Sequence, residues 1–396
     1  MVTVLNFLRQ NLGGGVQNAL SFIETLSTLD DPQNYQVFAR QGSAIAKKSL
    51  EYGFDTCAVA GGTVAQLRFG TTCKHRFKPG QLCFTFFGPP WRSTQGHLLN
   101  VCGVAYSNLY YPEIEFWKQY RGLPRWKREL KDRLRLRGLS HADYWIFETE
   151  TLAKRAVRLA HYPAERVGVV RMTASSLVCP ERVQVACANA FDQQIPQGFR
   201  FLFLASAAPN KRIDRAAAIA ARMKQLTDRP FVMVTTMPTD APYFRQVAEA
   251  FQSHGVSANW YNVKPCPYDQ VSSLISTCDS MCLFSVLESF SNNFVESWRM
   301  QKPLVAADYD WSRAITGDGA LLVDPENPSA TGERLVELIN NPEQIKKLVD
   351  QGAAQLSGYP TTIEKCKMYL QRLEDARQLG RLGKKQRSGI EQWSCK

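Results

Sequence analysis

Short apolar runs alternate with amphipathic stretches along most of the chain. Clear runs lie at residues 82–87, 199–205 and 281–285, and turn-forming residues follow each of them. Stretches with a helical repeat of apolar positions lie between the runs, for example at residues 150–159. This alternation predicts strand–helix units, which assemble into parallel sheets through right-handed crossovers. The sequence therefore predicts an α/β protein.

The pattern divides the chain into two such blocks. Residues 174–199 lack strong periodicity and contain two prolines, so we predict the interdomain linker there. A chain of 396 residues also agrees with two domains, at about 100–200 residues per domain. The predicted parts are residues 1–190, residues 191–365, and a helix with a basic tail at 366–396 that could cross back onto the first domain.

Composition narrows the class of protein only slightly. The hydrophobic share of 44% and the charged share of 21% are typical of a globular protein and exclude a disordered one. The net charge of +12 favours an anionic partner, which could be nucleic acid, acidic lipid or a phosphorylated substrate. No stretch approaches about 18 consecutive apolar residues, so we predict no transmembrane helix.

Cysteine usage and the start of the chain indicate a cytoplasmic protein. The eleven cysteines are scattered and show neither a Cys-x-x-Cys pair nor zinc-like spacing, which favours reduced thiols. Residues 1–8 are apolar but carry no basic residue ahead of the apolar run and no cleavage-like site. We therefore expect a first strand there and no signal peptide.

Residues 283–298 form the stretch with the most informative chemistry. An apolar run leads into a polar loop, and a helical pattern then begins at Ser291, Asn292 and Asn293. The N-terminus of such a helix favours phosphate, because its first N–H groups and its dipole attract anions. Glu288 and Glu296 would repel phosphate, so we expect them to bind hydroxyl groups on either side of it. A nucleotide sugar has that layout. The alternative is a capped helix with surface carboxylates.

A second candidate for phosphate binding follows the run at 199–205. Lys211 and Arg212 come after this predicted strand and precede a helix from about residue 214. Two cations beside a helix N-terminus can clamp a diphosphate. The alternative is a pair of solvated loop cations.

A glycine loop follows the first predicted strand. Gly13, Gly14 and Gly15 separate that strand from an amphipathic stretch. Glycines at this place let the backbone approach a ligand, although a purely structural turn is the alternative. The sequence matches neither the dinucleotide fingerprint nor a P-loop.

The segment 121–137 is strongly basic and also amphipathic. Apolar residues recur in it at helical spacing, at Leu123, Trp126, Leu130 and Leu134, and eight lysines and arginines surround them. Three interpretations stay open. The helix could lie on an anionic membrane surface, it could bind nucleic acid, or its apolar stripe could pack on its own domain and leave the basic face solvated.

Two further residue patterns invite a chemical interpretation. His97 lies in a loop between two predicted strands, where anchoring of the loop is the preferred interpretation over catalysis. Asp308-Tyr-Asp310 has the form of a metal–diphosphate motif, but it follows the helix that carries Glu296. We therefore reject a metal site there.

The carboxylates and the sequence downstream of them resemble a known family. Glu288 and Glu296, with seven residues between them, precede Lys302-Pro303 and the run from Gly319 to Pro325. This arrangement resembles the donor-site signature of retaining GT-B glycosyltransferases of the family 4 type, the glycosyl transferases group 1. The resemblance covers residues 199–350 well and 1–173 loosely. It implies two Rossmann-like, doubly wound domains that face a central cleft.

The resemblance also implies roles for individual residues. Glu288 would contact the donor sugar, Glu296 the ribose, and the N–H groups of residues 291–293 the sugar and diphosphate. Lys211 matches the phosphate-binding lysine, and Ser206 replaces the family's arginine, so Arg212 is the candidate for the second cation. The backbone at Val263 and Lys264 would border the nucleobase, and the glycine loop 13–15 would lie across the cleft from the donor.

The predicted function is the transfer of a sugar from a nucleoside diphosphate donor to a hydroxyl group, with retention and without a metal or other cofactor. The acceptor would be a glycan or a lipid-linked glycan. A basic nucleic-acid-binding protein is an alternative, but it leaves the two glutamates and the Lys211 loop unexplained. A catalytically inactive GT-B scaffold is the other alternative, because Ser206 and the turn 171–174 depart from the family pattern.

Overall fold

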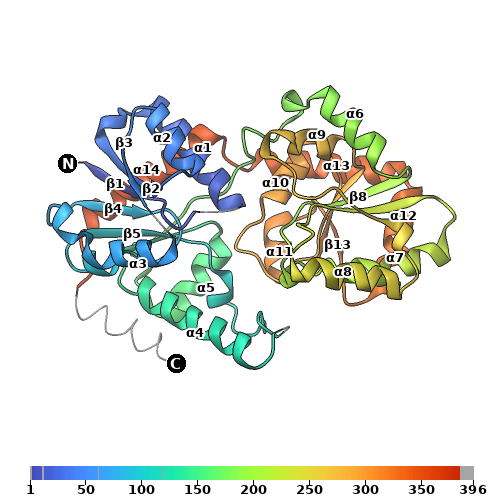
Figure 1. Ribbon diagram of the computed structural model, residues 1–396, viewed down its shortest axis with the longest axis horizontal. Coiled ribbons are helices and arrows are strands. Elements are labelled where there is room, and N and C mark those ends of the chain that lie inside the picture. Colours follow the sequence, from blue (N-terminus) through green and yellow to red (C-terminus); the bar gives the residue numbers. More distant parts are fainter. Residues whose placement is uncertain (1, 11–12, 61, 119, 384–396) are drawn as a thin grey trace. The chain divides into compact units, whose positions relative to one another are not determined.

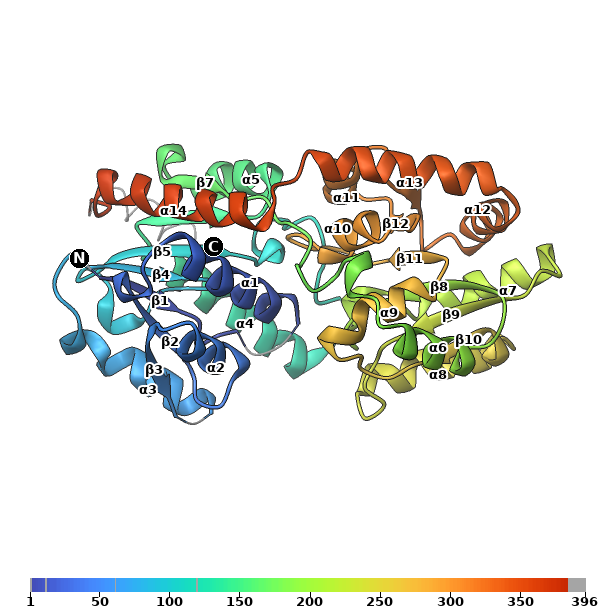
Figure 2. The same cartoon turned by 90° about the horizontal axis from the view of Figure 1, so that it is seen from above.

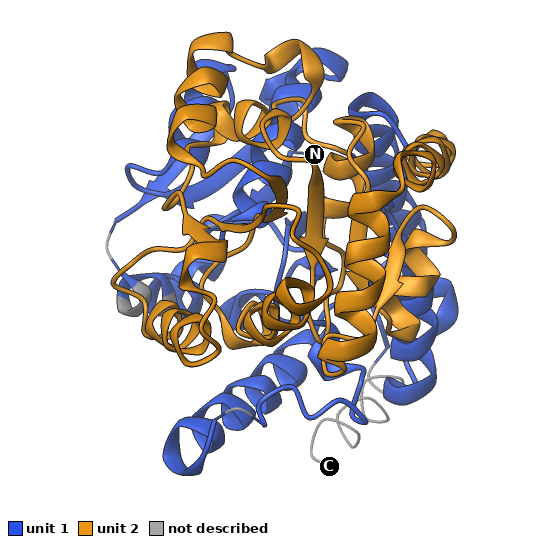
Figure 3. Ribbon diagram, turned by 90° about the vertical axis from the view of Figure 1, so that its right-hand side faces the viewer, with its two compact units in different colours: residues 1–173, 360–396 blue, residues 174–359 orange. Residues whose placement is uncertain are grey.

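The chain forms two compact α/β units in the computed structural model (Figure 1), which describes residues 2–10, 13–60, 62–118 and 120–383. Unit 1 comprises residues 1–173 and 360–396, and unit 2 comprises residues 174–359 (Figure 3). Each unit has its own parallel sheet. The predicted pair of α/β domains is therefore confirmed, whereas the central cleft stays a prediction. Residues 384–396 of the basic tail lie outside the described residues.

Unit 1 is built on a seven-stranded parallel sheet with the order β3-β2-β1-β4-β5-β6-β7. The strands are β1 (Thr3–Asn6), β2 (Tyr35–Arg40), β3 (Asp55–Val59), β4 (Leu82–Thr85), β5 (Leu99–Val104), β6 (Tyr144–Phe147) and β7 (Val167–Val169). The helices are α1 (Gly14–Leu29), α2 (Ala44–Glu51), α3 (Thr63–Thr72), α4 (Gly122–Leu139), α5 (Glu150–Ala160) and α14 (Thr362–Leu379).

Both faces of this sheet are covered, which explains the continuous apolar runs of its strands. In β1, Leu5 joins an apolar cluster with α1 and α14, and Val4 joins a second cluster on the other face. The ring of Tyr369 in α14 lies 5.3 Å from that of Phe22 in α1, so these helices pack together although they stand far apart in the sequence (Figure 2). The chain thus returns to unit 1 at its last helix.

Unit 2 is built on a six-stranded parallel sheet with the order β10-β9-β8-β11-β12-β13. The strands are β8 (Phe199–Phe203), β9 (Phe231–Thr235), β10 (Trp260–Asn262), β11 (Ser280–Leu283), β12 (Leu304–Ala307) and β13 (Leu321–Val323). The helices are α6 (Val185–Gln194), α7 (Arg215–Leu226), α8 (Pro242–Ser253), α9 (Val271–Ser276), α10 (Asn292–Arg299), α11 (Asp310–Thr316), α12 (Pro328–Asn340) and α13 (Pro342–Ser357).

Each sheet contains one place where strands that are not consecutive in the sequence are neighbours at its centre. These places lie between β1 and β4 in unit 1 and between β8 and β11 in unit 2. The connections after two such strands leave in opposite directions, which opens a crevice at their carboxyl ends. Ligands of open α/β sheets bind in that crevice, so β8 and β11 position the candidate site.

The observed boundary between the units lies earlier in the chain than the predicted one at 190/191. The backbone N–H of Cys179 donates to Ser272 Oγ (3.1 Å), and that of Gln184 donates to Ser273 Oγ (2.9 Å). Residues 174–190 therefore belong to unit 2, and the predicted linker contains helix α6. Their partners lie far along the sequence, so the local pattern could not reveal this attachment.

Arg200 holds the end of α6 onto the sheet of unit 2. Its side chain is 5% exposed, and its guanidinium donates to Asp192 Oδ1 (2.5 Å), to Ile195 O (2.8 Å) and to Thr277 O (3.1 Å). This buried arginine therefore links β8, where it lies, to the end of α6 and to the segment before β11.

We expect Arg200→Ala to lower the free energy of unfolding by about 3 kcal/mol, because buried carbonyl groups lose their donor. Urea denaturation of the purified protein measures this loss. Arg245→Ala, at an exposed position of α8, is the control and should change stability by less than about 0.5 kcal/mol. Equal stability of the two variants would contradict the role of Arg200.

The basic segment forms α4, but its apolar residues do not pack on the unit. Leu123, Trp126, Leu130 and Leu134 are all exposed. The interpretation in which this stripe packs against its own domain is therefore wrong. Among the described residues no helix is both long and apolar enough to cross a membrane, and every cysteine is free.

Candidate functional site

Two loops meet at the carboxyl ends of β8 and β11. The backbone N–H of Val286, after β11, donates to Asn210 O, after β8 (2.9 Å). Asn293 Nδ2, in the first turn of α10, donates to Leu204 O (2.9 Å). These two bonds hold the loop that carries Lys211 against the loop that carries Glu288 and the start of α10.

Lys211 and Glu288 form an ion pair at this place. Lys211 ends a short 3-10 helix, Pro209–Lys211, and its Nζ donates to Glu288 Oε1. The two side chains are only 18% and 17% exposed. The structure thus brings together two predicted site residues that are far apart in the sequence. An ammonium group beside a carboxylate can meet phosphate oxygens while the carboxylate accepts from hydroxyl groups.

Arg212 points to a different carboxylate. Its backbone is left-handed (φ 51°), and its Nε lies 3.7 Å from Glu326 Oε1 without a hydrogen bond. Arg215 Nε also donates to Glu326, at 3.0 Å. Arg212 is therefore adjacent to Lys211 in the chain but does not share its partner. The prediction that Arg212 clamps a diphosphate stays a prediction.

Sequence reasoning missed Glu326. It follows β13 directly, so it lies at the same carboxyl edge of the sheet as Lys211 and Glu288. Its position at the end of an apolar run, in Leu321-Leu-Val-Asp-Pro-Glu326, was the available signal.

The N-terminus of α10 lies at the carboxyl ends of β8 and β11. Ser291 is the N-cap residue, yet its side chain makes no capping hydrogen bond. Anions favour such a helix start because of the dipole and the backbone N–H groups of the first turn. The predicted strand, polar loop and helix start of residues 283–298 are observed, with the helix at Asn292–Arg299.

Glu296 is a buried carboxylate on α10. The residue is 2% exposed, and its Oε1 has no hydrogen-bond partner. Desolvation raises its pKa to about 7. Buried polar atoms in native proteins are nearly always bonded, so an unpaired oxygen needs an explanation. A hydroxyl group of a ligand would supply the missing donor.

Val263 and Lys264 follow the edge strand β10, at the same end of the sheet. The backbone N–H of Val263 donates to Thr235 O (2.9 Å), so this group is already bonded within the protein. Lys264 is exposed and has a left-handed backbone (φ 67°). Their proposed contact with a nucleobase stays a prediction.

One glycine of the loop in unit 1, Gly13, has a local structural role. Gly13 has φ 66° and is the N-cap residue of α1, which begins at Gly14. A Cβ atom on Gly15 would lie 2.5 Å from Gln10 Oε1, which is the end of a side chain that can rotate away, so this position does not require glycine. The loop follows β1, at the carboxyl edge of its sheet, and contact with a ligand there stays a prediction.

His97 anchors a loop, as the preferred interpretation has it. Its Nε2 donates to the carbonyl oxygen of Phe77 (2.9 Å), and its own carbonyl accepts from Gly80 N (2.8 Å). These two bonds tie the turn before β4 to the segment before β5.

Asp308 and Asp310 are both engaged by one arginine. Arg313 donates to Asp308 Oδ1 from Nε (2.6 Å) and to Asp310 Oδ1 from Nη1 (3.2 Å). Within the described ranges, no group of three or more His, Cys, Asp or Glu side chains is placed to hold a metal. That transfer needs no metal stays a prediction.

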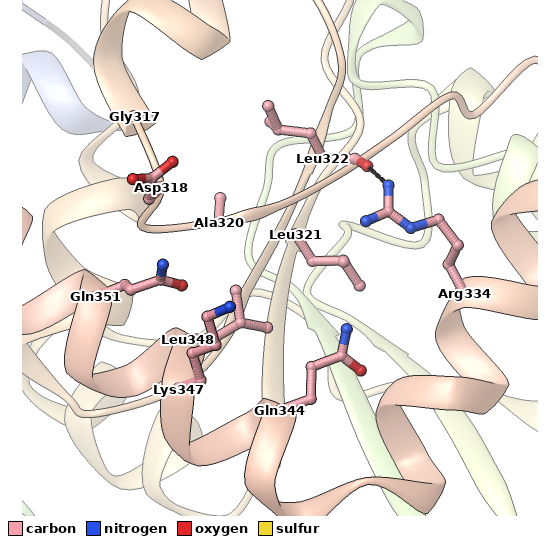
Figure 4. Close-up of a pocket in the computed structure, with 10 residues that line it drawn as sticks. All are labelled: Gly317, Asp318, Ala320, Leu321, Leu322, Arg334, Gln344, Lys347, Leu348 and Gln351. Carbon is pink, nitrogen blue, oxygen red and sulfur yellow. Dashed lines mark hydrogen bonds between the residues drawn. The ribbon is translucent and has the colours of Figure 1, made fainter.

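A separate pocket of about 330 Å³ lies beside β13 and α13 (Figure 4). Arg334 donates from Nη1 to the carbonyl oxygen of Leu322 at its rim. None of the candidate donor residues lines this pocket, so it is not the site described above. Its lining consists of Gly317, Asp318, Ala320, Leu321, Leu322, Arg334, Gln344, Lys347, Leu348 and Gln351.

Part of the chain is similar to known glycosyltransferases. Residues 189–355 match the family described as "Glycosyl transferases group 1", and this range contains all the candidate residues of unit 2. A curated relative, an uncharacterized glycosyltransferase from Methanocaldococcus jannaschii, is 33% identical over 87 residues. That match covers 22% of this chain and only 25% of the relative's length.

The whole chain also resembles solved structures. A glycosyltransferase from Rickettsia africae has a TM-score of 0.70 at 11% identity, over 95% of this chain and 98% of that one. HepE from Anabaena, in complex with UDP-glucose, has a TM-score of 0.69 at 13% identity, over 94% and 99%. The chain has the GT-B fold. The predicted fold class is thereby confirmed, and the family match lies within the second α/β unit of this GT-B protein.

Proposed function

We propose that this GT-B protein is a retaining hexosyltransferase that uses a nucleoside diphosphate sugar and needs no metal. The observation that carries the proposal is the meeting of Lys211, Glu288 and the N-terminus of α10 at the β8–β11 crevice. A family match over the same residues supports it. HepE, which has a similar fold, was crystallised with UDP-glucose, and this favours a nucleotide sugar as the donor.

The diphosphate would bind at the start of α10. As the bond to the sugar breaks, the leaving diphosphate gains negative charge. Lys211 and the N–H groups of residues 291–293 would stabilise this charge most strongly in the transition state, and such preorganised charges are usually a large part of catalysis. Arg212 would add a second cation by turning from Glu326 to the phosphate.

The carboxylates would bind the two sugars of the donor. Glu288 would accept hydrogen bonds from the transferred sugar, and Glu296 would accept them from the ribose, which satisfies its unpaired Oε1. The segment at Val263 and Lys264 would border the base. The acceptor is a hydroxyl group of a glycan or a lipid-linked glycan, which attacks the face of the sugar that the diphosphate leaves.

Thermal unfolding with a panel of nucleotides tests the donor site. We expect one of UDP, GDP, dTDP and ADP to raise the melting temperature by several degrees, with either magnesium or a chelator present, because a ligand at about 100 times its Kd adds about 2.7 kcal/mol of stability. A shift that requires magnesium would contradict the metal-free proposal. If no nucleotide produces a shift, the donor site itself is wrong.

The stereochemistry needs its own measurement. With the nucleotide identified, the corresponding nucleotide sugars are incubated with glycan and lipid-linked acceptors, and proton NMR reports the anomeric configuration of the product. Retention supports the proposal, and inversion overturns it. Nucleotide binding without release of the sugar would instead favour an inactive scaffold.

A further inference from the structure

Helix α4 exposes apolar side chains and buries an acidic one, which is the reverse of an ordinary surface helix. Two residues of α4 are buried against unit 1, the acidic Asp132 in the middle of the helix and Leu139 at its end. Asp132 is 8% exposed and accepts from Asn108 Nδ2 and from Trp117 Nε1, both at 2.6 Å. The guanidinium of Arg128 lies 3.8 Å from the centre of the Tyr120 ring, in a cation–π contact. Polar and cation–π contacts therefore attach much of the helix to the unit.

The opposite face of α4 is apolar and points to solvent. Leu123 is 60% exposed, Trp126 57%, Leu130 38% and Leu134 61%. These residues are three or four positions apart, so they form one continuous stripe along the helix. We call these four residues the α4 stripe. A surface helix normally buries such a stripe in the core and exposes its charged side.

Cations flank the α4 stripe on both sides. At 100° per residue, Lys127 and Lys131 lie on one side of it and Arg133 and Arg137 on the other, and all four are exposed. The two acidic residues of the helix lie elsewhere, because Asp132 is buried and Glu129 pairs with Arg125 (2.7 Å). The outward face therefore combines large apolar side chains with positive charge only.

We propose that α4 docks unit 1 on the surface of an anionic phospholipid bilayer. The helix lies at the lower rim of unit 1 in Figure 1, outside the sheet. The α4 stripe would enter the boundary between headgroups and acyl chains, while the flanking cations meet lipid phosphates. A nucleic acid would use the cations but would leave the stripe in water, and a second copy of the chain would bring like charges together.

Docking through α4 does not depend on the sugar-transfer reaction, because the surface consists of α4 residues alone. If the proposed function holds, docking would also place the enzyme beside lipid-linked acceptors. Loss of nucleotide binding would refute the donor site without affecting vesicle binding, and the reverse also holds. The two proposals can therefore fail separately.

Co-sedimentation of the full chain with vesicles tests the docking surface. We expect binding to an equimolar mixture of phosphatidylcholine and phosphatidylglycerol, and little binding to phosphatidylcholine alone. Leu134→Ser should weaken binding roughly fivefold, and Trp126→Ser/Leu134→Ser roughly thirtyfold. Leu50→Ser is the matched control, since Leu50 is also 61% exposed but lies on α2, and it should bind like the wild type. Leu134→Met should retain binding.

Reversing the charge of lysines beside the α4 stripe provides a second test of vesicle binding. Lys127→Glu/Lys131→Glu should reduce binding to anionic vesicles at least twentyfold, because each lysine near the surface contributes roughly fivefold. The control is Lys47→Glu, at an exposed position of α2. All variants should keep the melting temperature of the wild type, since every changed side chain is exposed.

Three results would overturn the proposal. The first is no binding to anionic vesicles, and the second is equal binding of Leu134→Ser and the wild type. The third is tight, salt-sensitive binding to duplex RNA or DNA that Lys127→Glu/Lys131→Glu abolishes and Trp126→Ser/Leu134→Ser leaves unchanged, which would assign α4 to nucleic acid.

Discussion

Replacement of Glu296 by glutamine is expected to stabilise the protein at neutral pH. Burial raises the pKa of this carboxyl group from 4.5 to about 7, so the folded state binds its proton more tightly than the unfolded state does. Its contribution to stability is complete below the unfolded pKa and is lost as the pH rises through the folded pKa. Glutamine cannot ionise and therefore avoids the cost of a buried charge.

The pKa shift of Glu296 sets the size of this stabilisation. A shift from 4.5 to about 7 corresponds to at most about 3 kcal/mol, which the wild type loses between about pH 4.5 and pH 7. Urea denaturation at about pH 5 and pH 8 should show Glu296→Gln equal to the wild type at the lower pH and more stable at the higher one. Glu337→Gln, at an exposed position of α12, should leave both values unchanged.

The same variant should bind a nucleoside diphosphate about 10-fold to 100-fold more weakly, because a carboxylate forms a stronger hydrogen bond to a hydroxyl than an amide does. Titration calorimetry with the nucleotide identified by thermal unfolding measures this loss. If Glu296→Gln is more stable but binds the nucleotide more weakly, the carboxylate of Glu296 serves ligand binding and not the fold. A variant that is less stable at every pH would show instead that Glu296 serves the fold.

Replacement of Lys211 by alanine is expected to lower kcat by about 10²–10³, because one preorganised donor to the leaving charge is lost. Glu288 also loses its ion-pair partner, so the variant should be less stable than the wild type. Lys211→Arg keeps the positive charge and should retain part of the activity. Lys224→Ala, at an exposed position of α7, is the control and should be fully active.

A double variant separates the two effects of Lys211. Lys211→Ala/Glu288→Gln removes the unpaired carboxylate, so it should recover most of the lost stability, while activity stays low because the cation and the carboxylate proposed to bind the donor are both gone. Recovery of activity along with stability would show that Lys211 only holds the loop in place. Initial rates of nucleotide release and urea denaturation on the same samples make the comparison.

Much of the fold and part of the site could be predicted from local sequence. Apolar runs that alternate with helical repeats identify parallel α/β units, because a covered sheet needs strands that are apolar on both sides. The polar loop before Glu296 marked the helix start at α10. The Lys211–Glu288 ion pair was not predicted, because it depends on β8 and β11 being neighbours in the sheet.

The missed features depend on distant partners. The attachment of residues 174–190 rests on hydroxyl groups of Ser272 and Ser273, and no local pattern encodes such bonds. The periodicity of α4 shows which residues share a face, but not which face contacts the protein. The burial of Asp132 decides that question, and it requires partners from the preceding segment.

The return of α14 to unit 1 has a consequence for biosynthesis. The ring of Tyr369 packs against Phe22 and Phe84, and Lys365 Nζ donates to Asn18 Oδ1 (3.0 Å), so the last helix completes a core begun by the first. Because α14 follows unit 2 in the sequence, the ribosome synthesises it only after all of unit 2. Unit 2, an uninterrupted stretch of residues 174–359, can therefore fold during translation, whereas the core of unit 1 stays incomplete until α14 has been made.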